Sequence, residues 1–168
     1  MAIVVKLLKW VEKPIEMLLW LGILAAVAMM VHVGIDVTGR TIFNSPFAGT
    51  TEIVAGWYMV AIAFFPWAWI AKNDNHIVAG MFQRLGGPRF EFWLEVAVKI
   101  WTSAFLYIFV WQTWVQAERQ MRIGEVWQAG GGFIPIWPAR WILPISAAFM
   151  IVYLVLRVIR DVAGDLRR

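Results

Sequence analysis

Hydrophobic residues in this chain are gathered into four long runs, which short polar stretches separate. A helix needs about 20 apolar residues to cross the roughly 30 Å hydrocarbon core of a bilayer, and each run is near that length. The backbone must satisfy its own hydrogen bonds there, which favours helices. The pattern therefore predicts an all-α integral membrane protein, one membrane domain with four transmembrane helices at about 15–35, 53–71, 92–115 and 138–156.

Three prolines bear on the shape of these helices. Pro66 lies inside the second run and predicts a kink, because proline removes one backbone donor and crowds the preceding turn. Pro138 and Pro144 lie in the first turns of the fourth run, where proline is best tolerated.

Two shorter segments have the pattern of amphipathic helices at the membrane surface. In Met1–Lys13 the lysines at 6, 9 and 13 share one helical face, and hydrophobic residues supply the rest. An ordinary positively charged flank explains that segment equally well. The segment Ile77–Leu85 repeats hydrophobic residues at helical spacing before Gly86-Gly87-Pro88 ends it. We expect a short interfacial helix at each place, the second one joining spans two and three.

Composition supports the membrane class and removes other classes. Hydrophobic residues make up 61% of the chain and charged residues 15%, against about 25% charged in a soluble domain. The net charge of +4 comes from basic residues beside the hydrophobic runs, so we expect no nucleic-acid partner. Without cysteine there is no thiolate chemistry. Several of the twelve tryptophans lie near the ends of the runs, where indole suits the lipid headgroups.

The basic residues also predict an orientation. Four spans place both termini and the middle connection on one side, and that side holds ten lysines and arginines in the flanks: Lys6, Lys9, Lys13, Lys72, Arg84, Arg89, Arg157, Arg160, Arg167 and Arg168. The other side holds four: Arg40, Arg119, Arg122 and Arg140. Positive charge favours the cytoplasmic side, so we predict an inner-membrane protein with both termini in the cytoplasm.

One ion pair is expected at membrane depth. Glu95 and Lys99 lie four residues apart with the acid first, which favours an intrahelical pair. Ionisable groups in a span are functional candidates because they are costly there unless paired or hydrated. The two residues therefore either neutralise each other or contact another chain.

Catalysis by this chain is not expected, and neither is a bound metal or cofactor. A haem held between neighbouring spans needs paired histidines, but His32 and His76 belong to opposite ends of the first two spans. The remaining acids are scattered over both sides of the membrane. A haem- or quinone-anchoring subunit of a respiratory oxidoreductase remains open as an alternative, as does a small transporter acting alone. The latter would need polar residues facing one another mid-bilayer, which spans one, two and four almost lack.

Four motifs in a fixed order carry a resemblance to a known family. They are Gly39-Arg40-Thr41-Ile42-Phe43-Asn44-Ser45-Pro46, then Thr51-Glu52, then Lys72-Asn73-Asp74-Asn75-His76-Ile77-Val78, and finally Pro135-Ile136-Trp137 with Pro144. Over about Val33 to Leu156 the chain resembles the Q-type (DctQ-like) small membrane subunit of tripartite ATP-independent periplasmic (TRAP) transporters. It departs from that family at Ala79-Gly80, where an acid is common. It also departs at Gly130-Gly131-Gly132, which marks flexibility or a close backbone approach.

The resemblance implies a role in transport and no reaction of its own. Such a small subunit binds and anchors a large multi-span permease subunit, which moves an organic acid with sodium. A periplasmic binding protein delivers the substrate. The sodium site is therefore expected in the large partner, and this chain is expected to act as a scaffold that needs no cofactor.

The resemblance also selects residues for the partner interface or the local structure. Arg40 and Glu52 are expected to pair across the first connection, or to contact a partner, or to remain solvated separately. Asp74 and His76 are expected to organise the connection after span two or to contact the partner. Trp137 and Pro144 belong to the motif that leads into span four.

Overall fold

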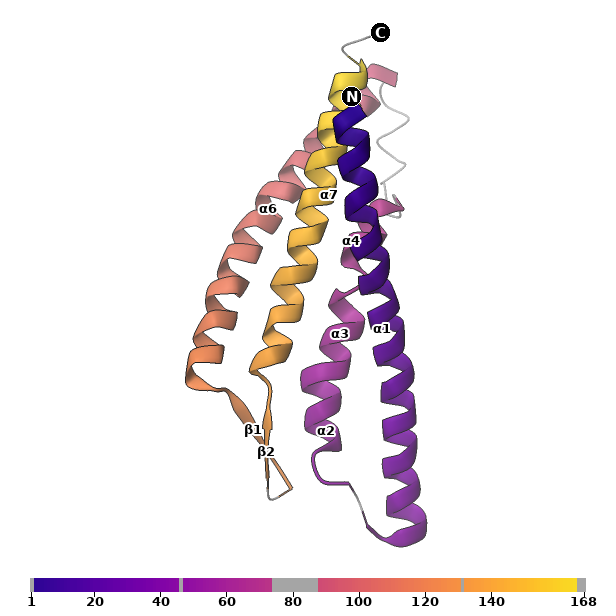
Figure 1. Cartoon of the computed structure of the whole chain (residues 1–168), viewed down its shortest axis with the longest axis vertical. Coiled ribbons are helices and arrows are strands. Elements are labelled where there is room, and N and C mark those ends of the chain that lie inside the picture. The colour runs from indigo at the N-terminus through magenta and orange to yellow at the C-terminus, as the bar shows by residue number, and fades with distance from the viewer. Residues whose placement is uncertain (1, 46, 74–87, 131, 166–168) are drawn as a thin grey trace.

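The computed structural model describes residues 2–45, 47–73, 88–130 and 132–165. Within them, four helical segments are long and apolar enough to cross a membrane, as predicted: Lys6–Phe43, Thr50–Lys72, Val96–Ile123 and Trp137–Ala163. They lie side by side along the length of the molecule (Figure 1). The start of α1 and the end of α7 lie at one end, here called the termini end. The opposite end carries a β-hairpin and is called the hairpin end.

The elements follow one another in a simple order. They are α1 (Ala2–Phe43), α2 (Thr50–Ile53), the π-helical turn η1 (Val54–Tyr58), α3 (Met59–Phe64), α4 (Trp67–Lys72), α6 (Pro88–Ile123), β1 (Val126–Ala129), β2 (Gly132–Pro135), the 3-10 turn η2 (Trp137–Trp141) and α7 (Ile142–Asp165). The expected surface helix at Ile77–Leu85 lies outside the described residues.

The prediction of a separate N-terminal surface helix is wrong in one respect. The segment is helical, but it forms the first turns of α1, which continues through Pro14. The reason is packing. Leu8 and Ile15 are buried against Ala68 of α4 and Tyr153 of α7, so the apolar side of these turns contacts protein. At 1.5 Å per residue, α1 is about 60 Å long, roughly twice the hydrocarbon thickness.

The second span is broken where proline predicted a kink. α3 ends at Phe64 and α4 begins at Trp67, with Phe65 and Pro66 forming a turn between them. α1 passes close to this break at the buried Gly22, where a Cβ would lie 3.4 Å from the Cβ of Phe65. A Cβ at position 22 would therefore make ordinary van der Waals contact with the second span.

α7 is the central helix of the bundle. It packs against α6, α4, α1 and α3, while α6 and α1 lie at opposite edges (Figure 1). Leu106 of α6 and Leu154 of α7 are buried in a cluster with Ala71 of α4. Ala147 and Ser146 of α7 are fully buried. Contacts with α7 therefore hold the outer helices in place.

A short β-hairpin follows α6, and the sequence did not predict it. β1 and β2 pair antiparallel in register, with Ala129 opposite Gly132. Gly130 in the turn has φ 51°, the left-handed conformation that glycine adopts without strain. The polar stretch 116–137, which we expected to be a connection, therefore divides into the last turns of α6 and this hairpin.

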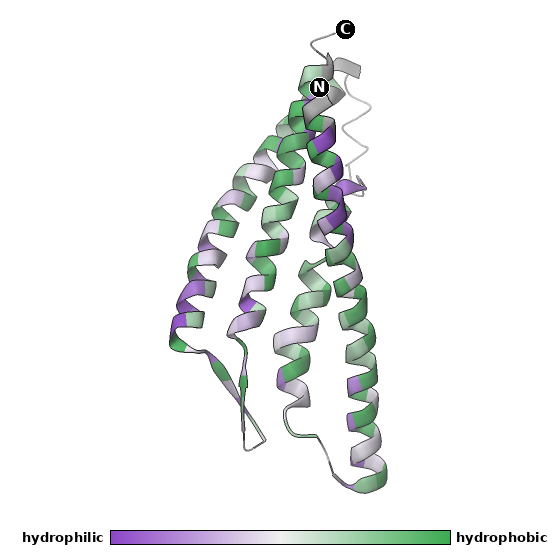
Figure 2. Ribbon diagram, in the orientation of Figure 1, coloured by the Kyte–Doolittle hydropathy of each residue, from purple (hydrophilic) through white to green (hydrophobic). Residues whose placement is uncertain are grey.

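Charged residues mark the ends of the four spans. Stretches 17–35, 53–71, 100–117 and 141–156 contain no Asp, Glu, Lys or Arg, and all of them lie in the described residues. Figure 2 shows hydrophobic residues along the middle of the long helices and polar residues gathered toward their ends. The charged side chains that flank these stretches form two polar regions, one at each end of the bundle.

Candidate functional site

Asp36 organises the first connection at the hairpin end. Its side chain is buried, with the residue only 3% exposed. One carboxylate oxygen accepts a hydrogen bond from the backbone N–H of Phe47 at 2.9 Å. The other accepts two from the Arg40 guanidinium, from Nε at 3.0 Å and Nη2 at 2.8 Å. These bonds fold the connection back against the end of α1.

The predicted pairing of Arg40 with Glu52 is therefore wrong. The Arg40 guanidinium contacts Asp36, one helical turn earlier on α1. The i,i+4 spacing of an acid and an arginine was the signal in the sequence that could have identified this pair. Glu52 is half-buried in the first turn of α2, where a negative charge complements the helix dipole.

The β-hairpin packs against the second span and the first connection. A Cβ at Gly130 would lie 2.5 Å from the Cβ of Ala48, so only glycine permits this approach. A Cβ at Gly49 would lie 2.6 Å from Cδ1 of Ile134, and Gly49 also has φ 87°. The Trp57 indole donates to the backbone oxygen of Pro135 at 3.1 Å. We call this assembly, β1, β2 and residues 47–49, the hairpin platform.

Glu125 and Arg140 join the base of the hairpin to the start of the fourth span. The Arg140 guanidinium donates to both carboxylate oxygens of Glu125, at 2.9 and 2.7 Å. The backbone oxygen of Glu125 accepts from Ile136 at 3.0 Å and from Trp137 at 3.4 Å. Trp137 thus begins η2 beside this pair, and Pro144 is fully buried in the first turns of α7.

The hydrogen bond from Arg140 lowers the pKa of Glu125 below its usual 4.5, while partial burial acts in the opposite direction. Because the folded pKa is lowered, the contact stabilises the hairpin above about pH 4.5 and is lost as pH falls through the folded pKa. We predict that hydrogen-exchange protection of the Ile136 amide decreases as the pH falls below 4.5, the usual pKa of a glutamate. The Arg140 side chain is 43% exposed, so the effect should stay within about 1 kcal/mol.

The Glu125→Gln variant is the control for this prediction. It should show lower protection of Ile136 at neutral pH and little further change on acidification. A wild-type profile that is flat between pH 6 and pH 3 would contradict the assignment.

An apolar cavity of about 190 Å³ lies between the hairpin, the second span and α6. The residues that line it come from η1, α3, α6, β1, η2 and α7: Ala55, Gly56, Val60, Phe64, Thr113, Gln116, Ala117, Trp127, Ile136, Ala139, Arg140 and Leu143. Its polar side-chain groups are those of Thr113, Gln116 and Arg140 and the indole N–H of Trp127, so the walls suit a hydrocarbon group with few polar atoms.

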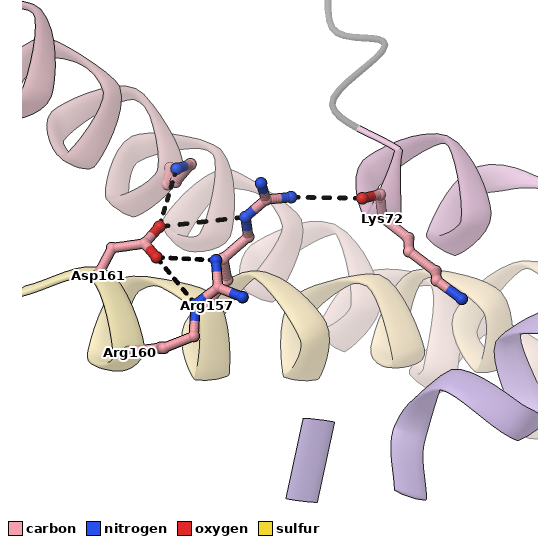
Figure 3. A network of polar contacts seen from close by, with 5 residues as sticks. Lys72, Arg157, Arg160 and Asp161 are labelled. Carbon is pink, nitrogen blue, oxygen red and sulfur yellow. Dashed lines mark hydrogen bonds and ion pairs between the residues drawn. The ribbon is translucent and has the colours of Figure 1, made fainter. Parts of the chain in front are cut away.

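A second polar cluster lies at the termini end, centred on Asp161 of α7. Its carboxylate accepts from Lys99 of α6 at 3.2 Å and from Arg160 at 3.0 and 2.9 Å (Figure 3). The Nε of Arg157 lies 4.0 Å away, and Arg157 also donates to the backbone oxygen of Lys72 at 3.3 Å. The Lys72 ammonium group in turn lies 2.7 Å from Glu16 and 3.6 Å from Glu12 of α1.

These contacts connect all four spans, and we call the cluster the termini network. Its members are Glu12, Glu16, Lys72, Lys99, Arg157, Arg160 and Asp161. Lys99 thus has a partner on α7 that the sequence analysis missed, because Asp161 is 62 residues away along the chain. The side chain of Glu95 and the residues Asp74 and His76 lie outside the described part of the structure.

His32 is the histidine whose surroundings are described. Its Nδ1 lies 3.4 Å from the hydroxyl of Tyr58, and the two rings meet edge to face. This contact joins α1 to η1. Among the described residues, no group of three or more His, Asp or Glu side chains is arranged to hold a metal ion.

The comparison with protein families decides which class these features belong to. A family described as "Tripartite ATP-independent periplasmic transporters, DctQ component" matches residues 29–164. The chain belongs to the DctQ family. The resemblance that the motifs indicated is thereby confirmed. A search of curated proteins gave no match.

The matched range contains both polar regions of this DctQ chain. It includes the hairpin platform, the Glu125–Arg140 pair and the Asp161 cluster, and it begins within α1. DctQ proteins are membrane components of a transporter and do not form an enzyme family. Both polar regions of this chain therefore belong to a membrane component of a transporter.

Proposed function

We propose that this chain is the scaffold subunit of a sodium-coupled TRAP transporter. It binds and anchors the large permease subunit, which takes up an organic acid that a periplasmic binding protein delivers. The family match carries this proposal, because the DctQ component is one part of a three-part system.

The polar contacts at both ends of the bundle support a rigid supporting role. The termini network connects all four spans, and the hairpin platform connects the second span, the first connection and the start of the fourth span. The stretches between them contain no charged residue. We infer that the coupling ion and the substrate bind in the large partner and that this chain holds no cofactor. The family match gives no support to a haem- or quinone-anchoring subunit.

We further propose that the termini end faces the cytoplasm of a bacterial inner membrane. The hairpin end, with Arg40, Glu52 and Trp137, then faces the periplasm, where the binding protein arrives. Ser45→Cys and Gln128→Cys should react with an impermeant thiol reagent added to intact cells, whereas Lys9→Cys should not. The chain has no native cysteine, so each variant carries one reactive site. The reverse labelling pattern would contradict the orientation.

Transport by reconstituted components tests the proposal directly. Proteoliposomes should contain this chain alone, the large permease alone, or both, with loaded binding protein and a sodium gradient. We expect uptake only when both membrane subunits are present, because the charge-free stretches offer no ion site. Full uptake by the permease alone would refute the scaffold role. Uptake by this chain alone would refute the proposal that the ion and the substrate bind in the permease.

A further inference from the structure

α6 is the least hydrophobic of the four spans, yet it lies at an edge of the bundle (Figure 1). It packs on α7, and a broad face on its other side remains exposed. The residues at the centre of that face recur at helical spacing: Trp101, Phe105, Ile108, Gln112 and Gln116. We call them the α6 outer face. Trp101 is 80% exposed, and Phe105 and Ile108 are each 63% exposed.

Gln112 and Gln116 distinguish this face from the rest of the bundle surface. Among the residues of the four charge-free stretches, the exposed side-chain amides are these two, and both lie on α6. Gln112 is about 5 Å from the middle of stretch 100–117, at 1.5 Å per residue. That depth is well inside a hydrocarbon core that extends about 15 Å to each side.

Lipid tails cannot satisfy an amide at that depth. A primary amide carries two N–H donors and one carbonyl acceptor, and leaving them unpaired in hydrocarbon costs free energy. A polar side chain on a neighbouring transmembrane helix satisfies them, which is how such residues hold helices together in membranes. The chemistry of this face therefore matches a protein neighbour better than lipid.

The other edge helix provides an internal comparison. Every exposed residue of α1 between positions 17 and 35 is apolar, including Leu24, Val27 and Met30. That surface fits lipid tails without any unsatisfied group. The two edges of the same bundle thus have different surfaces.

The apolar cavity adjoins the α6 outer face. Gln116 belongs to both, and Phe64 of α3 and Leu143 of α7 also line the cavity. Phe105 stacks on Phe109, whose ring lies 6.0 Å from that of Trp67, so aromatic contacts continue from the face into the second span. At protein interfaces, the anchoring side chains of one partner commonly enter a pocket beside aromatic residues of the other.

We propose that a transmembrane helix of the large permease docks on the α6 outer face. A polar side chain of that helix hydrogen-bonds to Gln112, and an apolar side chain enters the cavity beside Gln116. This inference rests on the proposed function and adds to it the surface of contact. The α1 edge faces lipid in the assembled transporter.

Photo-crosslinking in the assembled complex tests the proposal. A photoreactive amino acid is placed at Ile108 or Gln112 on α6, and at Leu24 or Val27 on α1 as the matched controls. Each variant is co-expressed with the permease and irradiated in the membrane. We expect permease adducts at least several-fold stronger from the α6 positions than from the α1 positions. Equal adducts from both helices would overturn the proposal, and so would α6 adducts that join two copies of this chain.

A substitution tests the role of the amide separately. Gln112→Leu should lower the amount of permease that co-purifies by several-fold, while Leu24→Ala should leave it unchanged. Each variant is first shown to remain monodisperse in detergent. If the wild-type chain fails to co-purify with any permease, the proposed function fails and this inference with it. If it co-purifies but α6 gives no adduct, the inference alone fails.

Discussion

Replacing Asp161 by asparagine is expected to lower the stability of the bundle by about 3 kcal/mol. Asp161 is the acid that Lys99 and Arg160 contact, with Arg157 close by. The side chains of Lys99 and Arg157 are each only 15% exposed, so water replaces the lost charge poorly. The loss corresponds to roughly 6–12 °C in the thermal midpoint of the detergent-solubilised protein.

The Arg122–Glu118 pair provides the matched control for Asp161. It also joins an acid to an arginine near a helix end, but its side chains are 75% and 42% exposed. Glu118→Ala should change stability by less than about 1 kcal/mol. If the Asp161→Asn and Glu118→Ala variants melt at the same temperature, the termini network does not stabilise the bundle as we describe.

Replacing Asp36 by alanine is expected to destabilise the protein and to loosen the first connection. The substitution leaves the backbone N–H of Phe47 without its acceptor and the Arg40 guanidinium without its acid. Hydrogen exchange should therefore accelerate at Phe47 by more than tenfold. The hairpin platform should also loosen, because Ala48 packs against Gly130.

Two further variants serve as controls for this prediction. Asp36→Asn keeps an oxygen that can accept from Phe47, so we expect an intermediate loss. Thr38→Ala, two residues along the same helix, removes only the exposed bond from Thr38 to the Gly34 carbonyl and should have little effect. Unchanged exchange at Phe47 in Asp36→Ala would show that Asp36 does not hold the connection.

Hydrophobic length was sufficient to predict the four spans, and Pro66 was sufficient to predict the break in the second. Both features depend on residues close together in the sequence. The extent of α1 was not predictable in this way. Leu8 belongs to a segment with the pattern of a surface helix, and its partners on α4 and α7 lie far along the chain.

The polar contacts also divide into those between residues close in the sequence and those between distant residues. The Asp36–Arg40 pair was available from i,i+4 spacing, and we missed it because Glu52 belonged to a family motif. The Lys99–Asp161 contact depends on the packing of α6 against α7, which no local pattern encodes. The hairpin strands are four residues each and are held by tertiary contacts at Gly49 and Gly130. Triple glycine indicated a close approach without indicating its partner.

The central place of α7 has a consequence for how the protein is made. Spans enter the bilayer in the order of synthesis, and α7 is the last of the four. Until it arrives, α1 and α6 lack the helix on which both pack, and Lys99 lacks Asp161. The first two spans can still contact each other through Glu16 and Lys72 and through His32 and Tyr58, whereas α6 lacks its main packing partner. A chain whose translation stops before α7 therefore lacks both the helix on which α1 and α6 pack and the acid that Lys99 contacts.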